Sequence, residues 1–259
     1  MKWSIRRSDL AGIISIPPSK SHTIRALLIA TLAQGKSVIR RPLITGDGQS
    51  ALCAAKSLGA EIKLIEDGIE ITGIGADYNK GDDFLDLGNS GTGTNLFASA
   101  AALGSRKRRF DGDSSLRSRP FKPLLESLSY LGATYNLEQS SSDLPFTIQG
   151  PLTGGKTKIN GVSSQFLSSI LLTSPLIRNG STLCSVYNLH EIPYVQLTLW
   201  WLNRQGIVFK CKPDFTEFEI PGDQCYRPFD MVVPADFSSA TFAAVGAAVH
   251  FQHAYLPSF

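Results

Sequence analysis

The sequence is poor in the features that mark secreted and membrane proteins. Its 259 residues include only four cysteines, Cys53, Cys184, Cys211 and Cys225, and no two of them form a CxxC pair. The first ten residues, MKWSIRRSDL, lack the apolar core of a signal peptide, so we expect reduced thiols and a cytoplasmic protein. The stretch SSATFAAVGAAVHF is too short and too polar at its ends to cross a bilayer, which takes about 20 apolar residues.

An excess of one charge and clusters of metal ligands are also lacking. The formal net charge is +3, which is too small by itself to indicate a nucleic-acid partner. The basic run from Arg106 to Arg109 is typical of a solvated turn. A nucleic-acid patch stays the alternative there, and steeply salt-dependent binding would reveal it. His250 and His253 form an HxxH pair without further ligands in view, so we expect no metal.

What the sequence does contain is an internal repeat, in a chain whose 42% hydrophobic residues can bury a sizeable core. Three similar segments, LGAEIKLIEDGIEITG, LGATYNLEQSSSDLPFTIQG and QGIVFKCKPDFTEFEIPG, have leading glycines at Gly59, Gly132 and Gly206, which lie 73 and 74 residues apart. Each glycine follows a helix-like run and precedes two strand-like stretches. A helix, a turn and a strand come before them, so the repeat predicts an α/β domain of three helix-strand-helix-strand-strand units.

The first unit opens with PPSKSHTIRALLIA, where polar and basic residues crowd the start of a helix. First-turn amides have no intrahelical partner and favour an anion, to which Lys20 and Arg25 would add full charges. If a pseudo-threefold axis relates the units, the helix starts at Ser21, 90–92 and 163–165 converge at one end of the domain. Together with an arginine from RSRP, they predict a site for a doubly charged phosphate. The plain alternative is a capped core helix with a solvated lysine and arginine.

Five motifs, in order along nearly the whole chain, carry a family resemblance. They are PPSKSHTIRALLIATLAQGKSVI, LDLGNSGTGT, GDSSLRSRP, GVSSQFLSSILL and PADFSSATFAA, and they resemble the 5-enolpyruvylshikimate 3-phosphate synthase family. The sister family of UDP-N-acetylglucosamine enolpyruvyl transferases typically has asparagine after the lysine, whereas Ser21 follows Lys20 here. The resemblance implies an enolpyruvyl transferase-like fold and transfer of the enolpyruvyl group of phosphoenolpyruvate to the 5-hydroxyl of shikimate 3-phosphate, with release of phosphate.

The resemblance also implies a set of nine substrate-binding residues and no metal or organic cofactor. By position in the motifs, these are Lys20 for both substrates, Ser21 and Arg25 for shikimate 3-phosphate, Gly91 and Arg119 for phosphoenolpyruvate, Ser163, Ser164 and Gln165 for the shikimate phosphate and ring, and Tyr194. The chemistry suits these types, because the substrates are anions and the reaction needs fixed cations and oriented donors.

Two positions depart from the family pattern in the neighbourhood of this site. Asn95 stands where the family usually has an arginine after GNSGTGT, so one supporting cation is missing. Glu191 and Ile192 precede the Pro-Tyr pair where a small hydroxyl residue and a basic residue are usual. A carboxylate beside a phosphate repels it. These departures favour an alternative function, namely a non-catalytic module that binds shikimate 3-phosphate without turnover.

The repeat spacing also predicts the domain organisation. A fourth unit begins at Ser238, 75 residues after Ser163, and the chain has no room to complete it. We therefore expect a three-repeat substrate domain over residues 15–230, with residues 1–14 and 231–259 as parts of a second, similar domain. We expect this version of the enzyme to be truncated, its catalytic proton-transfer groups to lie beyond residue 259, and the chain alone to be inactive. We expect a monomer whose partners are the two small substrates, with no nucleic acid or membrane.

Overall fold

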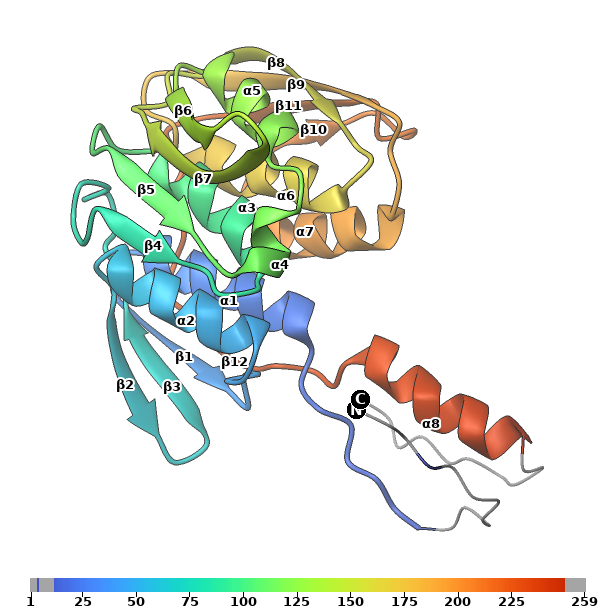
Figure 1. Ribbon diagram of the computed structural model, residues 1–259. Coiled ribbons are helices and arrows are strands. Elements are labelled where there is room, and N and C mark those ends of the chain that lie inside the picture. Colours follow the sequence, from blue (N-terminus) through green and yellow to red (C-terminus); the bar gives the residue numbers. More distant parts are fainter. Residues whose placement is uncertain (1–3, 5–11, 250–259) are drawn as a thin grey trace.

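The structure, a computed structural model, describes Ser4 and residues 12–249 of the chain. Three four-stranded sheets surround a core of helices (Figure 1). The first unit comprises α1 (Lys20–Leu32), β1 (Lys36–Arg40), α2 (Asp47–Ser57), β2 (Glu61–Ile65) and β3 (Gly68–Thr72). Its element order is the predicted one.

The second and third units repeat this order with additions. The second comprises β4 (Phe84–Asp86), α3 (Gly91–Ala101), β5 (Arg108–Asp111), the short α4 (Ser114–Arg117), α5 (Lys122–Ser129), β6 (Thr134–Gln139) and β7 (Ser142–Gln149). The third comprises β8 (Gly155–Asn160), α6 (Ser164–Thr173), the 3-10 turn η1 (Ser174–Leu176), β9 (Ser181–Tyr187), α7 (Ile192–Arg204), β10 (Lys210–Cys211) and β11 (Glu217–Pro221). Last come β12 (Asp230–Val232) and α8 (Phe237–Val249). The predicted α/β fold of repeated units is confirmed.

Each sheet contains one strand that the sequence pattern did not predict. The sheet orders are β12-β1-β3-β2, β4-β5-β7-β6 and β8-β9-β11-β10, and in each the first pair is parallel while the others are antiparallel. In the first sheet this extra strand comes from the far end of the chain, since β12 pairs with β1. Because β12 runs two residues past position 230, the predicted boundary at 230 falls inside a sheet strand; the domain boundaries themselves stay a prediction.

The first helix of each unit is buried on nearly every side, which explains its weakly amphipathic sequence. In α1, ten of 13 residues are buried, and in α6 nine of ten are buried. A helix that is apolar all round belongs in a core rather than at a surface. Helix α3 packs against both α1 and α6, so the three helices form the centre of the domain. The leading glycines Gly59, Gly132 and Gly206 have φ values of 101°, 106° and 71°, as a helix C-terminus of this kind requires.

The basic run in the second unit is only partly a solvated turn: the expectation is wrong for Arg108, whereas Lys107 is exposed. Arg108 begins β5 and is fully buried, and its guanidinium donates to carbonyl oxygens that include Tyr78 O at 3.0 Å and Ala101 O at 3.3 Å. Arg106 is ion-paired with Asp83, and Arg109 with Glu138. Carbonyl oxygens and carboxylates of the same domain therefore engage the three arginines of this run, while Lys107 is exposed.

The two segments that leave the domain run side by side. Pro18 pairs with Ala235 in an antiparallel bridge, and Ser19 N donates to Pro234 O at 2.8 Å. Helix α8, which follows, stands away from the three sheets (Figure 1) and exposes apolar side chains such as Phe242. No helix within the described residues is long and apolar enough to cross a membrane. The HxxH pair at His250 and His253, and most of the predicted segment 1–14, lie outside the described residues.

Candidate anion-binding site

The three core helices share one capping device at their starts. Ser19 Oγ accepts from His22 N at 3.4 Å, Ser90 Oγ from Gly93 N at 3.1 Å, and Ser163 Oγ from Gln165 N at 3.3 Å. A serine N-cap satisfies only part of the first turn, which leaves amides directed outward. All three starts therefore offer hydrogen-bond donors to an anion.

Side-chain hydrogen bonds show that these helices meet at the same end. Arg25 in the second turn of α1 donates from Nη2 to Ser168 Oγ in α6 at 3.1 Å. Asn95 in α3 donates from Nδ2 to Gln165 Oε1 in α6 at 3.1 Å. Because all four residues lie in the first two turns of their helices, the N-termini of α1, α3 and α6 converge.

Arg25 lies beneath this end of the domain with only 2% of its surface exposed. Its guanidinium also donates to Thr198 Oγ1 at 2.9 Å, to Ser21 O at 3.2 Å and to Tyr194 O at 3.3 Å. None of these partners is charged, and burial lowers the pKa of Arg25 to about 10. A buried cation with neutral partners makes the potential above it positive. Arg25 thus supplies charge to the site, while its own donors tie α1 to α6 and α7.

Lys20 occupies the rim of the same end. Its Nζ lies 3.3 Å from Asp47 Oδ2, at the start of α2, and about half of its side chain is exposed. Such an exposed pair contributes only about 0–1 kcal/mol. Asp47 therefore orients the ammonium group of Lys20. A ligand anion can replace Asp47 as the partner of this ammonium group at little cost in free energy. No motif in the sequence indicated Asp47 as a partner of Lys20.

The start of α3 lies against a second exposed cation. A Cβ added to Gly91 would lie 2.7 Å from Arg119 Nη1, so the absence of a side chain lets the guanidinium approach the first turn. Arg119 also donates to Asn89 Oδ1 at 2.6 Å. Arg117, the other arginine of RSRP, instead forms two bonds of 2.8 Å with Asp111. The motif thus divides into a structural arginine and one placed at the helix start.

Asn95 connects two core helices through its side chain, which the sequence alone did not indicate. Its Nδ2 bridges Gln165 Oε1 and Gly91 O, at 3.1 and 2.9 Å. Its Oδ1 is buried and has no hydrogen-bond partner among the described residues. The asparagine that replaces the expected cation therefore orients Gln165 and couples α3 to α6.

The start of α6 is covered by a carboxylate. Glu191 Oε2 accepts from Ser164 Oγ at 2.9 Å and lies 3.4 Å from Ser164 N. Glu191 is the N-cap of α7 and has a left-handed backbone, with φ of 56°. Tyr194, in the first turn of α7, donates from its N–H to Glu191 O at 3.0 Å. The triplet 163–165, which was predicted to bind phosphate, is thus in contact with an acidic side chain.

All nine predicted site residues lie within the described part of the chain, and hydrogen bonds or close contacts connect most of them at this end. Residues that the sequence reasoning missed hold them in place, namely Asp47, Asn89, Ser168 and Thr198. Single polar residues of this kind carry no local signal of such roles, since their partners are far away in the sequence. No group of three or more potential metal ligands occurs within the described residues.

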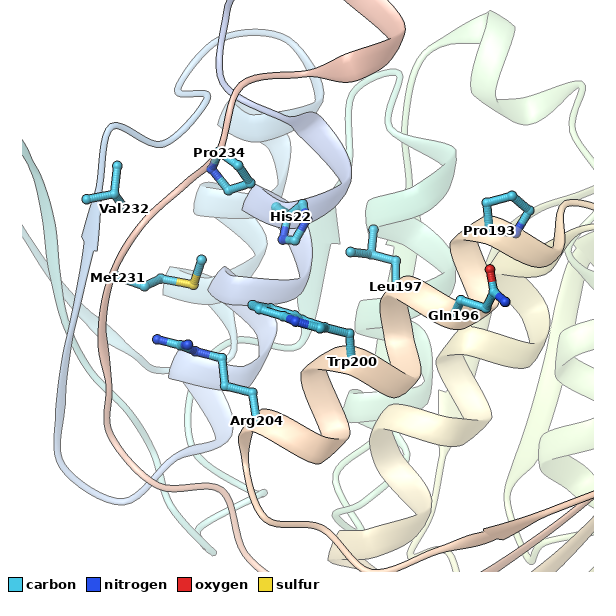
Figure 2. Close-up of a pocket in the computed structure, with 9 residues that line it drawn as sticks. All are labelled: His22, Pro193, Gln196, Leu197, Trp200, Arg204, Met231, Val232 and Pro234. Atoms are coloured by element: carbon cyan, nitrogen blue, oxygen red, sulfur yellow. The ribbon is translucent and has the colours of Figure 1, made fainter. Parts of the chain in front are cut away.

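A groove of about 710 Å³ lies along α1, α7 and the segment that crosses them. Figure 2 shows His22 of α1 facing Trp200 of α7, with Met231 and Pro234 of the crossing segment opposite. None of the nine predicted site residues lines it. Its walls are largely apolar, which does not suit a phosphate, so the candidate site remains the convergent helix starts.

A protein family, curated relatives and a solved structure match this chain over nearly its whole length. Residues 5–253 match the family model described as EPSP synthase (3-phosphoshikimate 1-carboxyvinyltransferase). Curated relatives with that enzyme name include proteins of Acetivibrio thermocellus, 44% identical, and Ruminiclostridium cellulolyticum, 43% identical; each alignment covers 96% of this chain and 58% of the relative. A solved EPSP synthase from Acinetobacter baumannii superposes with a TM-score of 0.79 at 25% identity, over 92% of this chain and 53% of that one. The chain thus spans a little over half the length of its relatives.

Proposed function

The chain belongs to the EPSP synthase family, and from this premise we propose that it forms the shikimate 3-phosphate half-site of a 3-phosphoshikimate 1-carboxyvinyltransferase. In the complete reaction, the 5-hydroxyl of shikimate 3-phosphate loses its proton to a base as its oxygen bonds to C2 of phosphoenolpyruvate, and an acid protonates the methylene carbon of phosphoenolpyruvate. Phosphate then leaves and a proton is lost from the new methyl group, which restores the double bond. The observation that supports this best is the convergence of the α1, α3 and α6 starts above the buried charge of Arg25.

The predicted cations and helix-start donors have roles that their surroundings allow. Lys20 and the first-turn donors of α1 and α6 would bind the two anions, and Arg119 beside Gly91 would bind the carboxylate or phosphate of phosphoenolpyruvate. Arg25 would stabilise the bound charge from below. Positioned donors and cations of this kind lower the barrier where negative charge moves between oxygens.

Proton transfer needs a further group. Asp47 is paired with Lys20, and Glu191 is hydrogen-bonded to Ser164, so both carboxylates already have partners. We propose that the acid and base come from the part of the relatives that this chain does not span. A positioned acid or base typically contributes a factor of about 10² to 10⁴, and domain closure adds orientation and exclusion of water. We therefore expect negligible turnover from the 259-residue chain alone.

Calorimetric titration with shikimate 3-phosphate tests the half-site. We expect measurable binding that Lys20→Ala weakens by about tenfold, since one charge contact to phosphate is lost. Lys36→Ala is the matched control, because Lys36 pairs with Glu70 on a sheet surface. No binding by the wild-type chain, or equal loss in the two variants, would contradict the proposal.

The second candidate function is a binding module without turnover, which the contact of Glu191 with the α6 start favours. Phosphate release from the two substrates distinguishes the two, measured with and without the remaining segment of a relative supplied as a separate polypeptide. Release only after complementation supports the split transferase. Binding of shikimate 3-phosphate without release in either case supports the module.

A further inference from the structure

The carboxylate of Glu191 lies where the proposed function requires a phosphate. Ser164 is the first residue of α6, so its N–H belongs to the first turn, whose amides have no intrahelical acceptor. Glu191 Oε2 accepts from the hydroxyl of this residue at 2.9 Å and faces its N–H at 3.4 Å. One oxygen of the protein's own anion thus contacts two donors that the half-site assigns to the substrate.

The local backbone holds the carboxylate in this place. Glu191 has φ of 56° and ψ of 42°, a left-handed conformation that residues with a Cβ rarely adopt. Two backbone hydrogen bonds fix this loop, because His190 N donates to Gly161 O at 2.9 Å and Tyr194 N donates to Glu191 O at 3.0 Å. Gly161 lies just before the Ser163 cap, so the loop that carries Glu191 is tied to the loop that begins α6. The side chain reaches Ser164 from a fixed position.

The start of α3 has the opposite sign of charge. There the exposed guanidinium of Arg119 lies against Gly91 in the first turn, which adds to the positive end of the helix dipole. At the start of α6, the carboxylate of Glu191 already interacts with the positive end of the helix dipole. An incoming phosphate dianion must displace this carboxylate or bind beside it, and both lower its affinity. A neutral hydroxyl meets no such repulsion and can donate to the carboxylate.

We propose that Glu191 is a specificity-determining residue that occupies the phosphate position of α6 and reduces the preference of this chain for a phosphorylated over an unphosphorylated cyclitol ligand. The inference rests on the proposed function. Removing the charge lets the phosphate take both donors of Ser164 without repulsion. The affinity for shikimate 3-phosphate then rises by about 10- to 100-fold, the range expected for one unit charge near a partly exposed anion.

The test compares Glu191→Gln with wild type by calorimetry, using shikimate 3-phosphate and shikimate as separate ligands. Glutamine keeps the size and an acceptor oxygen, and circular dichroism with thermal unfolding checks that the variant is folded. Glu61→Gln is the matched control, since it removes the same charge from an exposed side chain on β2. The expected result is a gain of about 10- to 100-fold for shikimate 3-phosphate in Glu191→Gln only, a change below about twofold for shikimate, and a smaller gain at high salt.

Three other results overturn the inference, and the first two separate it from the proposed function. If wild type binds shikimate 3-phosphate and Glu191→Gln binds it no more tightly, the inference is wrong while the half-site stands. An equal gain for both ligands also refutes it, because the effect then does not depend on the phosphate. If neither wild type nor Glu191→Gln binds shikimate 3-phosphate, the half-site and the inference both fail.

Discussion

Burial makes His22 an acid-sensitive point in the helix that carries Lys20 and Ser21. Its ring packs edge-on against Trp200 with centroids 5.5 Å apart, and its Nδ1 is buried without a hydrogen-bond partner among the described residues. Loss of hydration, and then the charge of Arg25, lower the pKa of His22 from an ordinary 6.5 to about 4. The folded chain therefore resists protonation of this imidazole.

The direction and size of the effect on stability follow from this difference. Between pH 6.5 and about 4 the unfolded chain binds a proton that the folded chain does not, so the free energy of unfolding falls as the pH drops through this window. Above it, His22 adds no pH dependence. Such a difference in pKa corresponds to ~3 kcal/mol in full. Because His22 is only partly buried, screening by solvent reduces the expected loss to ~1–2 kcal/mol.

Urea unfolding at about pH 7 and about pH 5 measures this loss. His22→Phe keeps a ring against Trp200 and removes the titration, so we expect wild type to lose ~1 kcal/mol more than this variant on acidification. His190→Phe, at an exposed imidazole, should behave as wild type does. Equal losses in wild type and His22→Phe would refute the reasoning, because the acid sensitivity would then come from other groups.

Substitutions of the two arginines of RSRP should affect ligand binding and stability separately. Arg119→Ala should weaken phosphoenolpyruvate binding in the presence of shikimate 3-phosphate by about tenfold without changing the unfolding midpoint. Arg117→Ala should lower the midpoint through loss of its Asp111 pair and leave binding unchanged; the reverse pattern would show that the assignment is wrong. Gly91→Ala should reproduce the binding loss of Arg119→Ala, because the added Cβ displaces the guanidinium. The double variant should lose no more than either single one, and additive losses measured by titration would contradict a shared contact.

The repeat was predictable because glycines at helix ends and alternating strands are local signals. The parallel strands β4, β8 and β12 were not, since two of the three are only three residues long and each pairs with a strand that is not close to it in the sequence. The buried state of Arg108 was missed for the same reason. A charged run indicates a solvated surface, and only the folded chain brings carbonyl groups of Tyr78 and Ala101 around it.

The candidate site was predictable in its chemistry but not in its contacts. Motifs indicated Lys20 and Arg119 as ligand-binding cations. They could not show that Arg25 is buried under the site, because its partners Ser168 and Thr198 lie 143 and 173 positions away. Glu191 was recognisable as an unusual residue next to Pro-Tyr, but its contact with Ser164 depends on how two loops fold together.

The pairing of β12 with β1 has a consequence for how this domain folds and unfolds. Arg40 and Asp230, joined by two bonds of 2.8 Å, lie 190 positions apart, so the first sheet cannot close until nearly the whole domain has left the ribosome. In an open array of repeats, the terminal repeats can unfold first. Here the first and last described strands, β1 and β12, pair with each other and so stabilise both ends of the domain. Contacts of such long range slow folding. Hydrogen exchange of the Val38 and Ile39 amides should therefore require unfolding of the whole domain with its three sheets.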